Sequence, residues 1–236
     1  MHYIFALVIM LAICFSLIPI LKRIANARIG NILFGFFVFV PYMIRIVLIG
    51  LNDGVTDWNF LNTMPTANVS PFLFFLVPFL FLMPKKIRKH VHLMVALTCV
   101  GMFVAGTFDC IRLTLAHYRW NWLFVFDQFC HIALAAWGVY LVKSNQVDLD
   151  FQSCLKSGSI LVGVALLMMV LNILFDTCFF GLSLNGKHNI YMMVLVENSY
   201  LSALIYFAGL IAVLAAGYGA LWVLQRAERP KHMAIS

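Results

Sequence analysis

Charged side chains are scarce in this sequence. Only 11% of its 236 residues are Asp, Glu, Lys or Arg, whereas 64% are hydrophobic, and the mean hydropathy is +0.97. A typical soluble domain has about 25% charged residues, because its surface must be covered with polar groups. The shortage of charge excludes a soluble globule and indicates a multi-pass protein of the cell membrane.

Short segments of alternating hydrophobicity, which are typical of membrane β-barrels, are also missing. Most of the apolar runs instead reach the length of about 20 residues that a helix needs to cross roughly 30 Å of hydrocarbon. The sequence therefore predicts an all-α fold, a bundle of seven transmembrane helices that forms a single domain over residues 1–236. The expected spans are 2–21, 30–51, 69–84, 91–117, 121–143, 157–181 and 200–225.

The third of these spans is short and contains Pro78. A proline inside a helix removes a backbone hydrogen bond, and irregular backbone at membrane depth must be buried by protein. We expect this span to be a tilted, kinked or broken helix that its neighbours cover.

Common catalytic and cofactor motifs are absent. The sequence has no phosphate-binding loop, no GxSxG motif and no dinucleotide fingerprint, and its six cysteines form no CxxC pair. Asp127 and His131 have no second histidine or thiolate at metal-ligand spacing. We therefore predict neither a metal nor another cofactor.

Basic residues in the predicted loops are distributed unequally between the two faces. Under the seven-span scheme, one side carries only Arg119 and Lys187. The positive-inside rule then places the N-terminus outside and the C-terminus in the cytoplasm, and the net charge of +7 needs no nucleic-acid partner. The basic residues of the cytoplasmic side are Lys22, Arg23, Arg28, Lys85, Lys86, Arg88, Lys89, Lys143, Lys156, Arg226, Arg229 and Lys231.

Ionisable residues within the spans nearly all fall in the half nearer the outer face. A charge at such depth costs about 2.5 to 3.5 kcal/mol on insertion scales, so it usually faces the bundle interior or a wet cavity. Pairs at i,i+3 or i,i+4 spacing also project from one helix face. We expect an outward-facing polar pocket whose ligand-binding residues are Arg45, Asp109, Arg112, Asn172 and Asp176, with Asn189, Tyr191 and Glu197 from the loop that precedes the last span.

Asp127 and His131 are the pair with the clearest chemical potential. A carboxylate beside an imidazole can set its tautomer and raise its basicity, which suits a general base or a proton relay. Cys110 and Cys130 lie next to this polar layer in the sequence, and each is a candidate nucleophile if a cation stabilises its thiolate. The candidate catalytic residues are thus Asp127, His131, Cys110 and Cys130.

Several features together resemble the bacterial YwaF-like family of seven-span membrane proteins and its eukaryotic relatives. They are the order of short-looped spans, the proline at the start of the third span, the stretch FVFDQFCHIALAAWGVYLV in the fifth, and the stretch HNIYM before the last. The resemblance implies that His131 is the family's fifth-span histidine. It also implies that Asn189, Tyr191 and Met192 correspond to the family's NYM-type stretch.

The chain departs from this family at the opening of the third span. The family has a Leu-Pro-Leu-His-Leu-Cys pattern there, whereas residues 70–75 read SPFLFF and keep only the proline. The eukaryotic relatives are thought to transfer acyl chains between lipids with a thiol and a histidine. By this resemblance, Cys110 or Cys130 would have to supply the thiol from another helix.

Three functions remain open at this level. The pocket could bind, and even transport, a small anionic ligand or a lipid headgroup through Arg45 and Arg112. The chain could instead be a membrane-embedded enzyme that modifies lipid, with His131 as the base. It could also be a structural or accessory subunit whose charges join helices. Membrane lipids are expected partners in each case, and the oligomeric state and any partner subunit stay open.

Overall fold

The computed structural model describes residues 2–24, 26–56, 58–61, 63–65, 67–115, 121–175, 177, 179–182 and 199–228, without the side chains of residues 2, 27, 58, 59, 105, 106, 108–115, 181, 199, 200 and 228. This part of the chain is all-helical. Its long helices are α1 (His2–Lys22), α2 (Ala27–Asp53), α5 (Lys85–Leu115), α6 (Trp122–Lys143), α7 (Phe151–Phe175) and α9 (Ser199–Glu228). The shorter ones are α3 (Trp58–Leu61), α4 (Val69–Leu76) and the 3-10 helices η1 (Val77–Leu82) and η2 (Phe179–Gly181).

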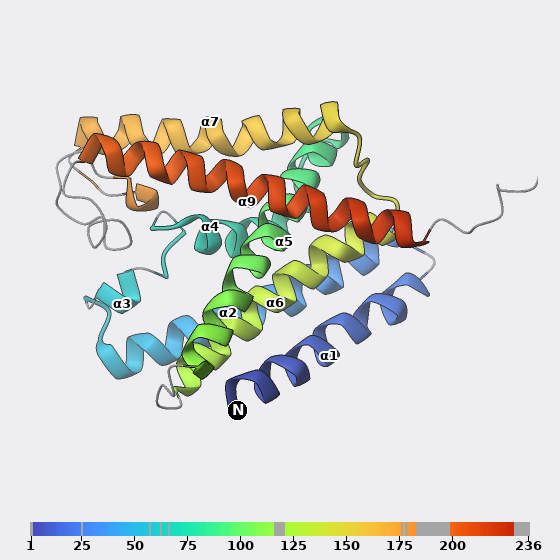
Figure 1. Cartoon of the computed structure of the whole chain (residues 1–236), viewed down its shortest axis with the longest axis horizontal. Helices are drawn as coiled ribbons and strands as arrows, with labels where there is room; N and C mark the ends of the chain where they lie inside the picture. The colour runs from blue at the N-terminus through green and yellow to red at the C-terminus, as the bar shows by residue number, and fades with distance from the viewer. Residues whose placement is uncertain are drawn as a thin grey trace, which may run out of the picture.

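Helices α5 and α6 form the centre of the bundle. Helix α5 contacts α9, α6, α7 and α1, and α6 also contacts α1 and α2. In Figure 1, α7 and α9 run along one side of the molecule and α1 lies along the other, with α5 passing between them. The peripheral helices therefore have faces that no other part of the described chain covers.

Those outer faces are strongly apolar. Leucine, isoleucine, valine and phenylalanine side chains of α1, α2, α7 and α9 are exposed, among them Phe5, Leu51, Leu174 and Leu204. Six helices among the described residues are long and apolar enough to cross a membrane. Apolar surface on this scale would be unfavourable in water, so the fold is that of a multi-pass helical membrane protein.

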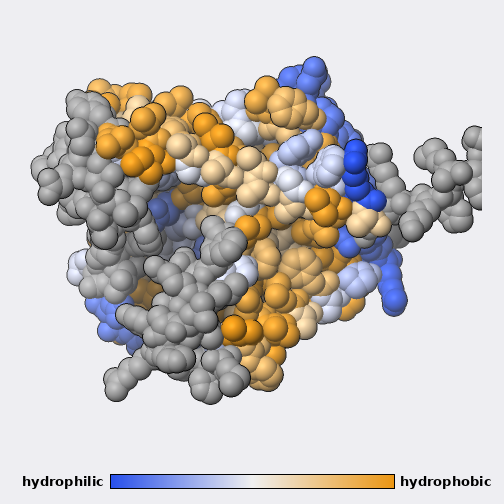
Figure 2. All heavy atoms as spheres, viewed as in Figure 1, coloured by the Kyte–Doolittle hydropathy of each residue, from blue (hydrophilic) through white to orange (hydrophobic). Residues whose placement is uncertain are grey.

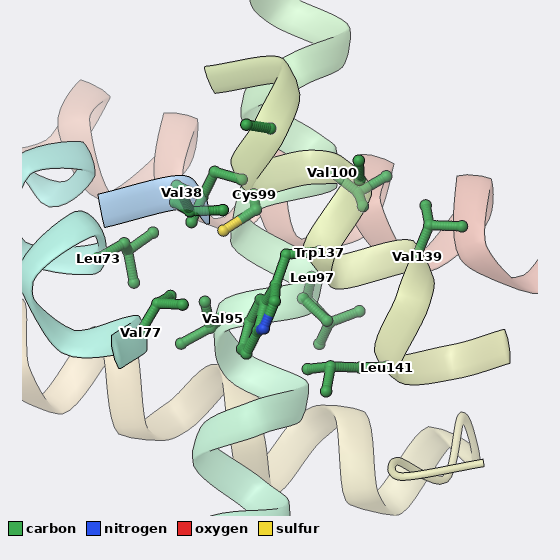
Figure 3. Close-up of a cluster of buried hydrophobic side chains, with 14 of the residues drawn as sticks. Val38, Leu73, Val77, Val95, Leu97, Cys99, Val100, Trp137, Val139 and Leu141 are labelled. Carbon is green, nitrogen blue, oxygen red and sulfur yellow. The ribbon is translucent and has the colours of Figure 1, made fainter. Parts of the chain in front are cut away.

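The core between the helices is tightly packed. Trp137 of α6 is fully buried, and Leu97 of α5, Leu73 of α4 and Val77 of η1 lie in the same apolar cluster (Figure 3). The indole Nε1 of Trp137 donates to Oδ1 of Asn31 at 2.7 Å, and the Asn31 amide lies 3.4 Å from Nε2 of His92. This small polar cluster satisfies the indole and joins α2, α5 and α6.

Helices α5 and α9 approach until their backbones touch. A Cβ atom added to Gly217 would lie 1.9 Å from the carbonyl oxygen of Leu97, and one added to Gly101 would lie 1.9 Å from that of Val213. Residue 97 thus faces 217 and residue 101 faces 213, so the two helices run antiparallel here. Close contact between small residues is a common way for membrane helices to associate.

Many of the basic residues lie at one end of the bundle. The carbonyl of Leu21 near the end of α1 and the hydroxyl of Tyr140 near the end of α6 both lie beside Gly30, at the start of α2. Asn31 in turn contacts His92 near the start of α5. The basic residues beside these termini therefore share one end, and Figure 2 shows strongly hydrophilic surface at that side of the molecule.

The segment expected as the third span is a broken helix. Helix α4 continues directly into η1, which has Pro78 in its first turn. Eight α-helical and six 3-10 residues give about 24 Å of length, somewhat less than the roughly 30 Å of hydrocarbon. Pro71, Phe74 and Leu80 are among its buried residues. The predicted interruption and burial are confirmed.

Helices α5 and α7 each begin six residues earlier than the hydropathy predicts. Helix α5 begins at Lys85 rather than 91, because hydropathy reports the hydrocarbon boundary and a helix can continue into the polar region beyond it. Helix α7 runs from Phe151 to Phe175 instead of 157–181. Asp150 caps it by accepting a hydrogen bond from the Ser153 amide at 2.9 Å, and bonding to Ser153 lowers the pKa of the Asp150 carboxyl.

Candidate functional site

Arg45 and Asp127 form an ion pair between α2 and α6. Nη2 of Arg45 lies 3.1 Å from Oδ1 of Asp127, and the two side chains are 19% and 23% exposed. Arg45 lies about 12 Å of helix before the end of α2, and about 21 Å beyond Asn31 at the basic end. Two of the charges predicted within the spans thus meet, in a contact between two helices.

His131 lies on the other side of the same carboxylate. Its Nδ1 is 3.7 Å from Oδ2 of Asp127 and 2.8 Å from the backbone oxygen of Asp127, one helical turn earlier. A carbonyl oxygen can only accept, so this hydrogen bond requires the proton on Nδ1. The bond leaves the lone pair of the neutral imidazole on Nε2, where it can take up a proton.

Two aromatic residues connect the ion pair to the broken helix. The ring of Tyr42 is stacked on Phe74 of α4, with centroids 4.1 Å apart and an angle of 11° between the planes. Phe74 also meets the ring of His131 edge-on at 5.4 Å, and the guanidinium of Arg45 lies 5.8 Å from the ring centre of Tyr42. We call Arg45, Asp127, His131, Phe74 and Tyr42 the polar-aromatic ring. Each of these five side chains contacts two others of the set, so each is positioned from two directions.

The segment between α2 and α4 is hydrogen-bonded to the polar-aromatic ring. The Tyr42 hydroxyl donates to the backbone oxygen of Thr63 at 2.8 Å, and both residues are buried. Farther along α2, the Phe60 side chain lies at 3.0 Å from the position of a Cβ on Gly50. Tyr42 and Phe74 were not among the sequence-based candidates. The i,i+3 spacing of Tyr42 and Arg45 is the one sequence signal that could have found the tyrosine.

Tyr42→Phe tests this attachment. The substitution keeps the ring stacked on Phe74 but leaves the buried Thr63 oxygen without its donor, which should cost about 1 kcal/mol of stability. We expect faster amide exchange over residues 58–65 in hydrogen-deuterium exchange. Tyr218→Phe, whose ring contacts Phe151 near the start of α7, is the matched control. Equal exchange in wild type and Tyr42→Phe would contradict the attachment.

The guanidinium of Arg45 retains unused donor capacity. It has five N–H groups, and Asp127 is its ion-pair partner in the described part of the chain. Its Nε is buried and has no hydrogen-bond partner there. A buried charged donor without an acceptor is unusual and needs an explanation, such as an ion or a water at the site.

Asn172 lies in a different cluster and supports a loop. Its Nδ2 donates to the backbone oxygens of Phe179 and Leu182 at 2.9 and 2.8 Å. Its Oδ1 accepts from the Phe179 amide at 2.6 Å and from the Thr177 hydroxyl at 2.9 Å. These four bonds use the normal capacity of an amide side chain. In this structure the chain itself therefore occupies the polar atoms that we expected to bind ligand.

Cys130, a candidate nucleophile, is fully buried in the apolar core. The other described cysteines, Cys14, Cys99 and Cys154, are also free and buried. A thiol in such surroundings is generally inert, because nothing stabilises the thiolate. Among the described side chains, the geometry favours packing rather than catalysis for cysteine.

Several predicted site residues lie outside the described part. Asp176, Asn189, Tyr191 and Glu197 are not described, and for Asp109, Cys110 and Arg112 only the backbone, in α5, is described. Their assignment stays a prediction. Among the described residues, no group of three or more His, Cys, Asp and Glu side chains could hold a metal.

The stretch that departs from the YwaF-like pattern packs directly on the site. Residues 70–75 lie in α4, which brings Phe74 against His131. Comparisons with family models, with curated proteins and with solved structures find no match. The resemblance to the YwaF-like family therefore stays a prediction. An aromatic side chain meets the histidine on this face, which supports positioning of His131 more than acyl transfer.

Proposed function

We propose that this protein binds an anionic group, from a small ligand or a lipid headgroup, at the Arg45 guanidinium within the polar-aromatic ring. The observation that carries the proposal is the buried Nε of Arg45, which has no acceptor in the described part of the chain. Arginine donates from a planar fork that matches carboxylate and phosphate oxygens. An oxyanion at this position would satisfy a donor that the described part of the chain leaves unpaired.

The proposal includes seven spans with the N-terminus outside the cell membrane. Besides the six long helices, the apolar segment Val69–Leu82 supplies the seventh crossing. The basic residues at the start of α2 and α5 and at the end of α6 support a cytoplasmic location for that end. The polar-aromatic ring then lies nearer the outer face, as the pocket would require.

Arg45→Gln tests the function. The purified full chain would be titrated with dimethyl phosphate, a soluble phosphodiester, by calorimetry. Because a hydrogen bond to a charged group contributes about 1.5 to 3 kcal/mol, the substitution should weaken binding by at least about tenfold. Arg28→Gln is the matched control, since Arg28 is exposed near the other end of the same helix.

The alternative is a brace that only joins α2 to α6. In that case neither wild type nor Arg28→Gln binds dimethyl phosphate, and Arg45→Gln shows a lower melting temperature without any ligand effect. Native mass spectrometry from phosphatidylglycerol nanodiscs provides the corresponding test for a lipid ligand. Absence of binding in both experiments would refute the proposed function.

A further inference from the structure

We infer that the anion enters this site together with one proton, which His131 holds on Nε2. The inference rests on the proposed function and adds a property to it. It follows from the charge balance of the polar-aromatic ring, from the tautomer of His131 and from the position of Asp127 between Arg45 and His131.

With His131 in its neutral form, the side chains of the polar-aromatic ring carry no net charge before a ligand binds. The charge of Arg45 is offset by Asp127 at 3.1 Å, and His131 in its neutral form adds none. A bound anion would therefore add one uncompensated negative charge in a largely buried site. An isolated buried charge is so unfavourable that proteins usually change a protonation state instead.

His131 is the group within the ring that can take up the compensating proton. Its Nδ1 is occupied by the hydrogen bond to the Asp127 oxygen, so the second proton goes to Nε2. The resulting imidazolium lies 3.7 Å from Oδ2 of Asp127, whose other oxygen contacts Arg45. The carboxylate thus stands between two cations once the anion and the proton are bound, and the sum of charges returns to zero.

Among the described side chains, the other charged or titratable groups near His131 do not supply this charge. On α2 they are Arg45, which stays protonated, and the Tyr42 hydroxyl, which donates to Thr63. On α4, Phe74 faces the imidazole and has no ionisable group. On α6 itself, the neighbouring Cys130 is buried in the core. The side chains of Asp109 and Arg112 on α5 lie outside the described residues, and this pair of opposite charges is formally neutral.

The ligand chemistry is an oxyanion of phosphate type, either a free phosphate ester or the headgroup of a phospholipid. Dimethyl phosphate is the probe for the shared chemistry, because it keeps one negative charge between about pH 5 and pH 8, the range in which histidine titrates. Nanodiscs of phosphatidylglycerol, with phosphatidylcholine nanodiscs as the control, provide the lipid form. Competition between dimethyl phosphate and retained phosphatidylglycerol identifies the lipid as the source, whereas binding of the soluble probe alone identifies a free ester.

Calorimetry on the wild-type full chain measures the proton directly. Titration with dimethyl phosphate in two buffers of different ionisation enthalpy should show net uptake of protons, up to one per site. Between about pH 5.5 and pH 8 the Kd should rise by at least about tenfold, since a single linked proton changes affinity up to tenfold per pH unit.

His131→Gln should bind with an affinity that no longer depends on pH, whereas His90→Gln, near the basic end of α5, should retain the wild-type dependence. Binding without proton uptake, or the same pH dependence in His131→Gln, would overturn this inference and leave the proposed function intact. No binding by wild type at any pH, in solution or in nanodiscs, would overturn both. Proton uptake is measured on the wild-type chain, so the inference can be tested even if His131→Gln folds poorly.

Discussion

Gly217→Val is expected to destabilise the protein by at least about 3 kcal/mol and to reduce the yield of folded chain sharply. A Cβ at residue 217 would lie 1.9 Å from the Leu97 carbonyl oxygen and 2.7 Å from the carbon to which it is bonded. Both atoms belong to the backbone of α5, so no side chain can rotate away. The two helices would have to separate, and their shared contacts would be lost.

The matched control for this substitution is Gly209→Val on the same helix, because nothing lies within 4 Å of a Cβ added there. Denaturant unfolding in detergent micelles would give the difference in free energy of unfolding. Gly101→Ala should also be destabilising, since its Cβ would meet the Val213 carbonyl in the same crossing. Equal losses at residues 209 and 217 would show that helix propensity, rather than the crossing, is responsible.

Asn172→Leu is expected to cost about 2 to 4 kcal/mol and to free the chain after α7. The substitution removes the four side-chain hydrogen bonds to Thr177, Phe179 and Leu182, and leaves behind partners that are partly or fully buried. Phe180, which is fully buried and has a φ of 56°, depends on this support to keep its backbone conformation. Thermal unfolding and amide exchange over residues 177–182 would measure both effects.

A series of substitutions tests whether the hydrogen bonds of Asn172 stabilise the loop. Thr177→Val removes one of the four bonds and should cost about 1 kcal/mol, whereas Ser159→Ala, on an exposed part of α7, should change stability little. If Asn172→Leu is as stable as Ser159→Ala, the bonds seen here do not support the loop. A loss of anion binding without a loss of stability would instead favour the ligand role expected for Asn172 from sequence.

A structural role that only joins α2 to α6 and an anion-binding role require different features of the polar-aromatic ring. For a brace, the ion pair between Arg45 and Asp127 is sufficient, and replacing both residues by apolar ones is close to neutral. A binding site requires the donor that Asp127 leaves unused. The buried Nε of Arg45 is therefore the feature that distinguishes the two functions and the reason to test Arg45 first.

Composition and hydropathy are enough to assign the class of this protein. Its apolar composition and helix-length runs are properties of each segment alone, because crossing a bilayer needs only length and hydrophobicity. The expense of intramembrane charge also singled out Arg45, Asp127 and His131 before any contact was known. The broken third span followed in the same way from a short run that contains Pro78.

Which side chains meet depends instead on how the helices pack. Tyr42 and Phe74 complete the site because Phe74 of α4 contacts both Tyr42 of α2 and His131 of α6, and no local spacing encodes that. Asn172 was expected beside the charged layer, but its bonds go to a turn a few residues later. The starts of α5 and α7 lie beyond the hydrophobic runs, since helix ends depend on caps and hydrogen bonds rather than on hydropathy. Partners distant in sequence are chosen by packing and by the need to satisfy buried polar groups, which act only when the helices are assembled.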